Sequence, residues 1–340
     1  MKKLFSISFL LLIMVSCGSG KYLSSYVSEE TGLNLTKITD ETQTSVIAGA
    51  EMHASLSSEK NSIAGSKQSK FAWSAIPALD ISPKDNKLVY ISTGGGAYSG
   101  QSVVVRNMSG LGMPTQRTTN RVVNSICWGS DARLYFTDIT VGEGSHICSI
   151  NAEGGSLVTQ HTTGDVLDDD AVLSKDGKYL YFTRANSSFG PSVWRIDLSN
   201  NTLTTCSRGY NPCPISGTND AYYCVRNSSS GRSEIWYVDF VKGVETLILT
   251  DEKISFAQPR ISPDGNWIVC EGNSKSNISK ENNVDIFVVR TDGSNLLQLT
   301  YHPAMDLCPI WSENGKSIYF ISSRANKDEK YNIWKMDINL

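Results

Sequence analysis

The stretch ISPDGNWIVCEG, residues 261–272, places the turn residues Pro-Asp-Gly between a serine and an alternating apolar strand. Asp-Gly supplies the positive φ that a tight turn between two strands needs. Alternation with a period of two buries one face of the strand that follows. The same arrangement recurs as LSKDGKYLYFTR at 173–184, WSENGKSIYFIS at 311–322 and ISPKDNKLVYIS at 81–92. The chain therefore repeats a strand–turn–strand unit.

Aligned on the serine that precedes the turn, the unit occurs six times along the chain, at Ser82, Ser130, Ser174, Ser216, Ser262 and Ser312. In each unit a third strand follows, and in the first five a fourth. Four short strands at a period in the forties are typical of a propeller blade. One blade cannot bury both of its apolar faces alone, so the blades must stack. The sequence predicts an all-β, six-bladed β-propeller of four-stranded antiparallel blades.

The sixth unit ends at residue 340 without a fourth strand. Near the N-terminus, TGLNLTKIT at 31–39 reads like DGSNLLQLT at 292–300, which ends the fifth unit. We expect residues 33–39 to be the outer strand of the last blade, which closes the ring and removes an exposed edge. Residues 53–75 hold an inserted hairpin or, as the alternative, a degenerate seventh blade. Residues 31–340 are then one propeller domain.

The first residues read as a targeting segment. Two lysines precede an apolar run at 4–15 that is too short to span a bilayer, and the run ends in Met-Val-Ser-Cys at 14–17. This resembles a bacterial lipobox, which implies a signal peptide over 1–16, a lipid on Cys17 and a tether over 17–30. Several acyl chains anchor a protein stably where one does not. The alternative is an ordinary secretory signal.

The remaining composition favours neither metal nor nucleic acid. The net charge is -3, without a basic excess, and the four histidines are scattered. Seven cysteines follow Cys17, mostly within apolar runs, and no CxxC occurs. Cys206 and Cys213 flank a loop and are the pair best placed to oxidise, but whether they are bridged stays open. We therefore predict no cofactor.

The repeated turns resemble the TolB-type propeller repeat, a relative of the WD-repeat blade with the pattern W-S-P-D-G-x-x-I-x-F. ISPDGNWIVCEG and WSENGKSIYFISSR match it best, followed by the DG-x-x-LT ending at 292–300. With the lipobox, the chain looks like the TolB-like lipoproteins of Bacteroidetes-type envelopes. The resemblance implies a lipid-anchored protein of the cell envelope, and we expect a monomer. Gly18 stands where an aspartate would follow Cys17, which by resemblance to known sorting rules favours the periplasmic side of the outer membrane.

Candidate binding residues lie in loops and at the axial mouth. Asp168, Asp169 and Asp170 are the densest acidic cluster, expected just before the first strand of the third unit. They suit a cation or a basic partner, although a solvated loop is the alternative and no EF-hand spacing supports calcium. Asp306, Tyr98 and Phe189 are further candidates. Three arginines follow the second strand of their units and are expected to pair with carboxylates: Arg184, Arg226 and Arg324.

No G-x-S-x-G motif occurs, and the propeller takes up the chain. We expect a non-catalytic scaffold that presents loops on a rigid frame to an unidentified envelope protein or peptide. The alternative is glycan binding, or less readily glycan cleavage, with Asp168, Asp170 and Asp306 as the acids and Tyr98 as a stacking ring.

Overall fold

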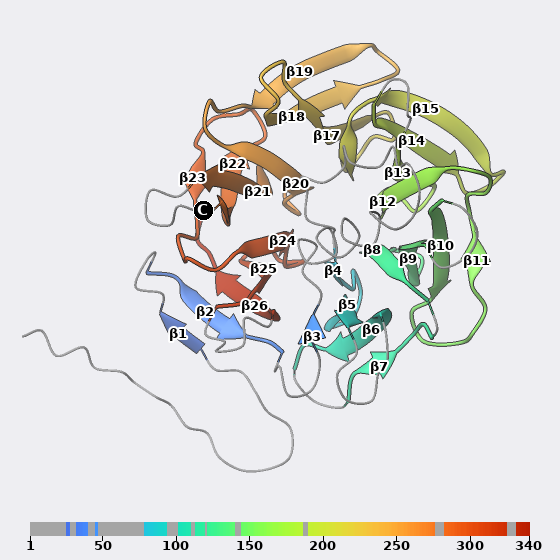
Figure 1. Ribbon diagram of the computed structural model, residues 1–340, viewed down its shortest axis with the longest axis horizontal. Helices are drawn as coiled ribbons and strands as arrows, with labels where there is room; N and C mark the ends of the chain where they lie inside the picture. The colour runs from blue at the N-terminus through green and yellow to red at the C-terminus, as the bar shows by residue number, and fades with distance from the viewer. Residues whose placement is uncertain are drawn as a thin grey trace, which may run out of the picture.

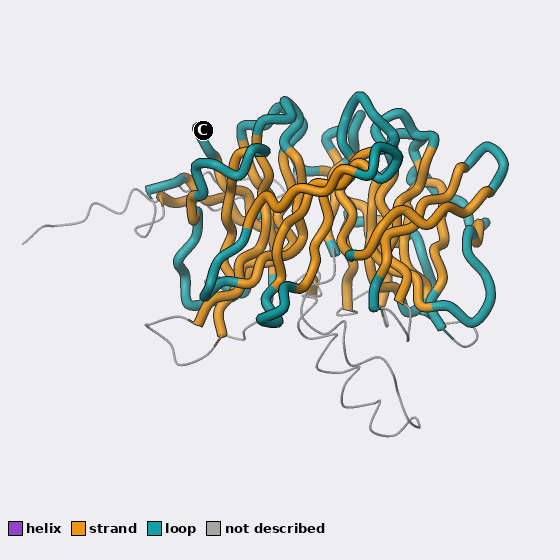
Figure 2. Tube along the Cα trace, turned by 90° about the horizontal axis from the view of Figure 1, so that it is seen from above, coloured by secondary structure: helices purple, strands orange, loops and turns teal. Residues whose placement is uncertain are grey.

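The computed structural model describes residues 25–27, 32–39, 45–46, 78–93, 101–109, 113–119, 121–139, 144–185, 190–275, 282–324 and 331–340. In this part of the chain the regular elements are all β-strands, and they form six antiparallel sheets around a common axis. The sheets are the blades of a propeller, seen down the axis in Figure 1 and from the side in Figure 2. The six-bladed all-β prediction is confirmed.

In blades 2 to 5 the strands run in chain order from the axis to the rim, whereas blade 6 takes its two outer strands from the N-terminal part of the chain. Blade 1 consists of β3 (Ser45–Val46), β4 (Leu79–Ile81), β5 (Lys87–Thr93), β6 (Gln101–Asn107) and β7 (Thr115–Gln116), with β3 and β4 both paired to β5. Blade 2 consists of β8 (Val123–Trp128), β9 (Arg133–Asp138), β10 (His146–Asn151) and β11 (Thr159–Gln160). Blade 3 consists of β12 (Leu167–Leu173), β13 (Tyr179–Ala185), β14 (Ser192–Asp197) and β15 (Thr202–Arg208).

The second half of the ring follows the same plan. Blade 4 consists of β16 (Tyr210–Pro214), β17 (Ala221–Asn227), β18 (Ser233–Asp239) and β19 (Val244–Leu249). Blade 5 consists of β20 (Ser255–Ile261), β21 (Trp267–Lys275), β22 (Asn282–Arg290) and β23 (Leu297–Gln298). Blade 6 consists of β24 (Asp306–Trp311), β25 (Ser317–Ser322), β26 (Asn332–Asp337), β2 (Asn34–Lys37) and β1 (Ser25–Val27).

The recurring serine holds the turn between the first two strands. Ser174 Oγ accepts the N–H of Tyr179 at 3.0 Å. In blade 5, Ser262 accepts the N–H of residue 267 at 3.0 Å, and in blade 6 Ser312 accepts that of residue 317 at 2.9 Å. The glycines of these turns have φ between 68° and 77°, a conformation that costs glycine nothing. The sequence repeat is therefore a repeat of turn chemistry.

The ring closes through the N-terminal strand, as predicted. β2 pairs with β26 in the register Leu35↔Met336 to Lys37↔Trp334. Thr39 Oγ1 then accepts the N–H of Ile333 at 2.9 Å, as Thr300 accepts the N–H of residue 286 in blade 5 at the same distance. The likeness of residues 31–39 to 292–300 thus reflects a shared strand ending. Closure by strands from both ends of the chain leaves no gap in the ring.

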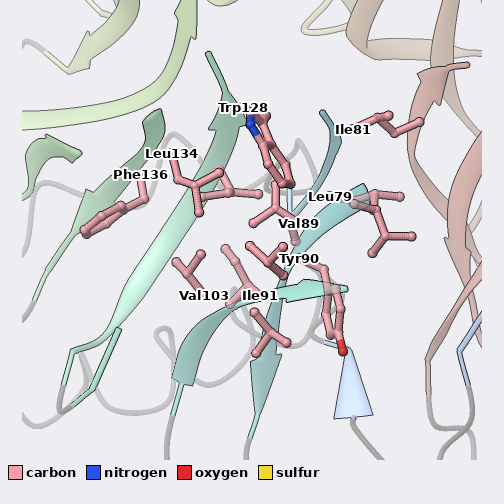
Figure 3. Packing of buried hydrophobic residues seen from close by; sticks show 14 of the residues in the cluster. Leu79, Ile81, Val89, Tyr90, Ile91, Val103, Trp128, Leu134 and Phe136 are labelled. Atoms are coloured by element: carbon pink, nitrogen blue, oxygen red, sulfur yellow. The ribbon is translucent and has the colours of Figure 1, made fainter. Parts of the chain in front are cut away.

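The core lies between neighbouring blades rather than within one. In Figure 3, Val89 and Ile91 of blade 1 pack toward Trp128 and Leu134 of blade 2, and all four belong to one buried cluster. Successive inter-blade clusters repeat this arrangement around the ring. Burial of apolar surface contributes roughly 25 cal/mol per Å², so stacking the blades is the main source of stability.

Candidate functional site

The inner strands that surround the axis are irregular at one repeated place. Pairing of the first strand with the second shifts register in blades 2 to 6. Within these bulges, four residues that are not glycine have φ between 50° and 55°: Asp170, Asn211, Gln258 and Cys308. Such bulges re-aim side chains and commonly lie next to functional sites. The side chains near the axis therefore differ from blade to blade on a common backbone.

Asp169 and Asp170, here called the axial acid pair, lie at the bulge of β12. Asp169 accepts hydrogen bonds from Asn124 Nδ2 at 2.5 Å and from Thr137 Oγ1 at 2.8 Å. Asp170 accepts one from Asn211 Nδ2 at 2.5 Å. Both carboxylates are half-buried. Blades 2 and 4 thus each supply an amide to the acidic residues of blade 3.

The axial acid pair concentrates negative charge in a poorly solvated place. Burial raises the pKa of Asp170 well above its usual range, and the charges of Asp169 and Glu271 raise it further. Arg260, on β20, lowers the same pKa by its positive charge. It also lowers the pKa of Asp80 in blade 1, although burial raises that pKa overall. Arg260 therefore acts electrostatically across the axis.

Asp168 and Asp306 have a different role. Neither side chain is exposed, and each is bound by an arginine of the same blade. Arg184 donates from Nε and Nη2 to the two oxygens of Asp168 at 2.6 and 2.8 Å. Arg324, which is 1% exposed, binds Asp306 through Nη2. Burial raises the pKa of Asp306 although Arg324 pulls it down. These two carboxylates are already neutralised inside the protein.

The expected place of the acidic cluster needs one correction. The sequence predicted that Asp168, Asp169 and Asp170 precede the first strand of the third unit, whereas they lie within β12, which spans Leu167–Leu173. Three consecutive aspartates are poor strand formers. Here a bound arginine, two asparagine amides and the bulge satisfy them, so tertiary contacts override local preference.

Arg184, Arg226 and Arg324 pair with carboxylates, as expected. Arg184 and Arg226, however, lie within the second strands β13 and β17 rather than after them. Arg226 lies at the same repeat position as Arg184, but Gly209, which precedes β16, occupies the place that Asp168 has opposite Arg184. Arg226 instead binds Glu245 of the outer strand at 2.8 Å through both of its terminal nitrogens. Arg184 and Arg226 also stack on Trp194 and Trp236, at 4.7 and 5.1 Å from the ring centroids.

Several predicted site residues lie outside the described residues: the lipidation site Cys17, the loop aromatics Tyr98 and Phe189, and the segment 53–75. Cys206 and Cys213 are described, and both are free thiols. Within the described ranges, no group of three or more His, Cys, Asp and Glu side chains is arranged to hold a metal ion. That same part of the chain contains no helix long and apolar enough to cross a membrane.

A polar pocket of about 540 Å³ opens between the turns of blades 3 and 4. Its lining includes Lys175, Asp176, Tyr179, Asn219 and Asp220. Asn219 Nδ2 donates to Asp176 at 2.8 Å, which joins the two turns. Lys175, which is exposed, adds a positive charge to the polar lining. The pocket therefore suits a hydroxylated or charged small molecule better than an apolar one.

Sequence reasoning missed the partners of the axial acid pair. Asn124 and Asn211 lie 45 and 41 residues from the carboxylates that they contact. Glu271 and Arg260 both lie in the part of the sequence assigned to the fifth repeat unit. The sequence did contain a signal for Glu271. It is a charged residue at a repeat position that is threonine in units 2 and 3 (Thr137 and Thr183) and apolar in units 1, 4 and 6.

The protein is a six-bladed β-propeller. Comparisons with known proteins show which of them have a similar sequence or fold. No family model matches the chain. An uncharacterized protein of Agrobacterium fabrum is 25% identical over 246 residues, 69% of this chain and 78% of that protein.

Among solved structures, a putative TolB from Agrobacterium tumefaciens has a TM-score of 0.51 at 21% identity, over 62% of this chain and 73% of that one. TolB from Acinetobacter baumannii has a TM-score of 0.60 at 16% identity, over 75% and 64%. An oligogalacturonate lyase from Vibrio parahaemolyticus has a TM-score of 0.58 at 10% identity, over 95% and 99%. The chain therefore has the propeller fold of TolB, a fold that an enzyme also has.

Proposed function

We propose that this protein is a non-catalytic, lipid-anchored scaffold of the cell envelope that binds an extended segment of a partner protein at the propeller rim. The observation that carries the proposal is a difference between blades. The outer strand of blade 6, β2, pairs with an added fifth strand, β1, in the register Ser25↔Thr36 to Val27↔Asn34. Within the described residues, β15 and β19 end the sheets of blades 3 and 4. Unpaired edges accept further strands.

The edge strands of blades 3 and 4 also carry apolar side chains that are exposed to solvent. Leu203 on β15 is 43% exposed, and Val244 and Leu247 on β19 are 45% and 40% exposed. Main-chain hydrogen bonds would supply affinity to an added strand, and these side chains would supply specificity. We call this surface, formed by β15 and β19, the rim surface. A lipid on Cys17 would hold it close to the outer membrane, on the periplasmic side.

A non-catalytic role is consistent with the state of the acids near the axis. Glycosidic cleavage uses two carboxyl groups that converge on one bond. Two of the three predicted acids, Asp168 and Asp306, are instead buried and neutralised by Arg184 and Arg324. Asp168, which Arg184 holds through two parallel hydrogen bonds, cannot act as an acid without breaking that pair.

The test is a capture experiment. The purified protein is immobilised and incubated with solubilised cell envelopes, and the bound partner is detected. A double variant with Leu203→Lys and Leu247→Lys should lose the captured partner, while the control Leu157→Lys, changed at a residue that is 82% exposed in blade 2, should retain it. All three proteins should unfold at the same temperature. Equal capture by both variants would contradict a rim site.

The anchor has its own test. Replacing Cys17 by alanine should abolish labelling with radioactive palmitate and move the protein from the membrane fraction to the soluble fraction. If the Cys17→Ala protein stays in the membrane pellet after a salt wash, the lipid-anchor proposal is wrong.

Glycan binding is a second candidate because of the pocket between blades 3 and 4. Tyr179 offers an aromatic ring there, and Asp176, Asn219 and Asp220 offer polar groups. Saccharide recognition combines such rings and hydrogen-bonding side chains. A glycan array should give a ligand whose binding Lys175→Ala and Tyr179→Ala both weaken. The absence of any saccharide ligand would remove this candidate.

A further inference from the structure

Apolar side chains gather at the outer edge where blades 5 and 6 meet. Leu296 and Leu297, at the start of the outer strand of blade 5, are 37% and 46% exposed, and Leu340 at the end of the chain is 45% exposed. Leu33 and Ile338, which flank the paired strands β2 and β26 of blade 6, are half-buried. We call these five side chains the edge patch. Single exposed apolar residues are common, whereas a group of them marks a contact surface.

The five side chains of the edge patch share one boundary between blades. Leu33 and Ile338 pack against the buried cluster between blades 5 and 6, which contains Val288 of β22. Val288 is the register partner of Leu297. Leu340 follows Ile338 by two residues, and the C-terminus lies on the side of the ring formed by blades 5 and 6 (Figure 1). The edge patch is therefore the exposed continuation of the core that joins these two blades.

The expected lipid attachment point is tied to the same side of the ring. Cys17 precedes Ser25, the first residue of β1, by eight residues, and β1 is the outermost strand of blade 6. An extended chain spans at most about 3.6 Å per residue, so the lipid and β1 are no more than about 29 Å apart. A folded domain of this length has a diameter of about 50 Å. The tether therefore holds the edge of blade 6, rather than the far side of the ring, beside the bilayer.

We propose that the edge patch rests in the headgroup layer of a phospholipid membrane, so that the ring stands on the boundary of blades 5 and 6. This inference rests on the proposed lipid anchor at Cys17. Apolar faces of interfacial segments are buried about 5–10 Å into the boundary between headgroups and acyl chains. The acyl chains bring the protein to the membrane, and the edge patch then fixes its orientation. The rim surface of blades 3 and 4 lies further around the ring and stays free for a partner.

A lipid surface fits the edge patch better than another protein does. A stable protein interface buries about 800 Å² on each partner, which three partly exposed side chains do not provide. The outer strand β23 has only two residues, so it offers few main-chain groups to an added strand. Contact with the membrane is an intramolecular step once the acyl chains have inserted, and a small apolar area then suffices.

The test places a fluorescent reporter in the edge patch. The new thiol of Leu297→Cys is exposed, whereas six of the seven native thiols in the described residues are buried and Cys206 is half-buried, so an NBD label reacts first at position 297. Leu203→Cys is the matched control, because Leu203 is 43% exposed on the outer strand of blade 3. The lipidated full chain is reconstituted into vesicles of phosphatidylethanolamine and phosphatidylglycerol. Lipids with a nitroxide on the acyl chain should quench the label at 297 at least twofold and leave the label at 203 unchanged.

The outcomes separate the edge patch from the anchor. Equal quenching at positions 297 and 203, in protein that floats with the vesicles, would overturn the inference and leave the anchor standing. Labelled protein that does not float with the vesicles would contradict the anchor and the inference together. Adding Leu296→Asp and Leu340→Asp should remove the quenching at 297 while the protein still floats and unfolds at an unchanged temperature. Quenching that persists in this variant would mean that the edge patch does not hold the ring on the membrane.

Discussion

The inner strands of blades 3 and 6 begin alike and then differ. β12 carries Asp168 and β24 begins with Asp306, each buried and bound by an arginine. The next residues are Asp169 and Asp170 in β12, whereas Leu307 and Cys308 occupy those places in β24. Both strands form the same bulge and pair in the same way. The fold therefore uses the first aspartate and does not require the two acids that follow it.

The largest expected effect is on the pair in blade 6. Asp306→Asn removes the carboxylate that binds the Arg324 guanidinium, in a pair of which neither side chain is exposed. Breaking a buried ion pair from one side costs about 3–5 kcal/mol. Chemical denaturation followed by circular dichroism should show a loss in this range. A loss below about 1 kcal/mol would mean that the pair does not support the fold.

The second effect has the opposite sign. Asp170→Asn should stabilise the protein by about 0.5–2 kcal/mol at pH 7 without divalent ions, because it removes a partly desolvated charge next to Asp169. Asparagine keeps an oxygen for the Asn211 amide and tolerates the φ of 55°. Denaturant unfolding of the variant in the presence of a chelator measures the difference.

The stability gain from Asp170→Asn should also depend on pH. The folded-state pKa of Asp170 lies above the ordinary value of 3.8, so the folded protein holds this proton more tightly than the unfolded chain does. The unchanged protein therefore loses stability from this group as the pH rises above about 4 through the raised pKa. The gain from Asp170→Asn should be absent below about pH 4 and should grow as the pH rises through the raised pKa. A gain that is independent of pH would rule out ionisation as its cause.

The smallest effect is expected at the arginine pair of blade 4. Glu245 is half exposed, so its pair with Arg226 is screened by water. Exposed ion pairs contribute about 0–1 kcal/mol. Glu245→Gln should cost less than 1 kcal/mol in the same denaturation assay, and less still in 1 M salt. A loss as large as that of Asp306→Asn would contradict the distinction between buried and rim pairs.

The architecture could be predicted from the sequence because its signals are local. The serine and the alternating strand recur in each blade, a Gly-containing turn recurs in blades 3, 5 and 6, and the closing strand repeats the Thr ending of blade 5. The roles of three consecutive aspartates could not be separated in this way. They depend on the bulge of β12, on Arg184 and on amides from blades 2 and 4. Such contacts exist only after the blades have stacked.

The most direct test of the account compares neighbouring carboxylates in one strand. Asp168→Asn and Asp170→Asn remove the same charge two residues apart in β12. Their free energies of unfolding should be measured side by side at pH 7 in the presence of a chelator. The account predicts opposite signs, with Asp168→Asn destabilising and Asp170→Asn stabilising. Destabilisation of similar size by both would contradict the claim that the fold uses the first acid and not the axial acid pair.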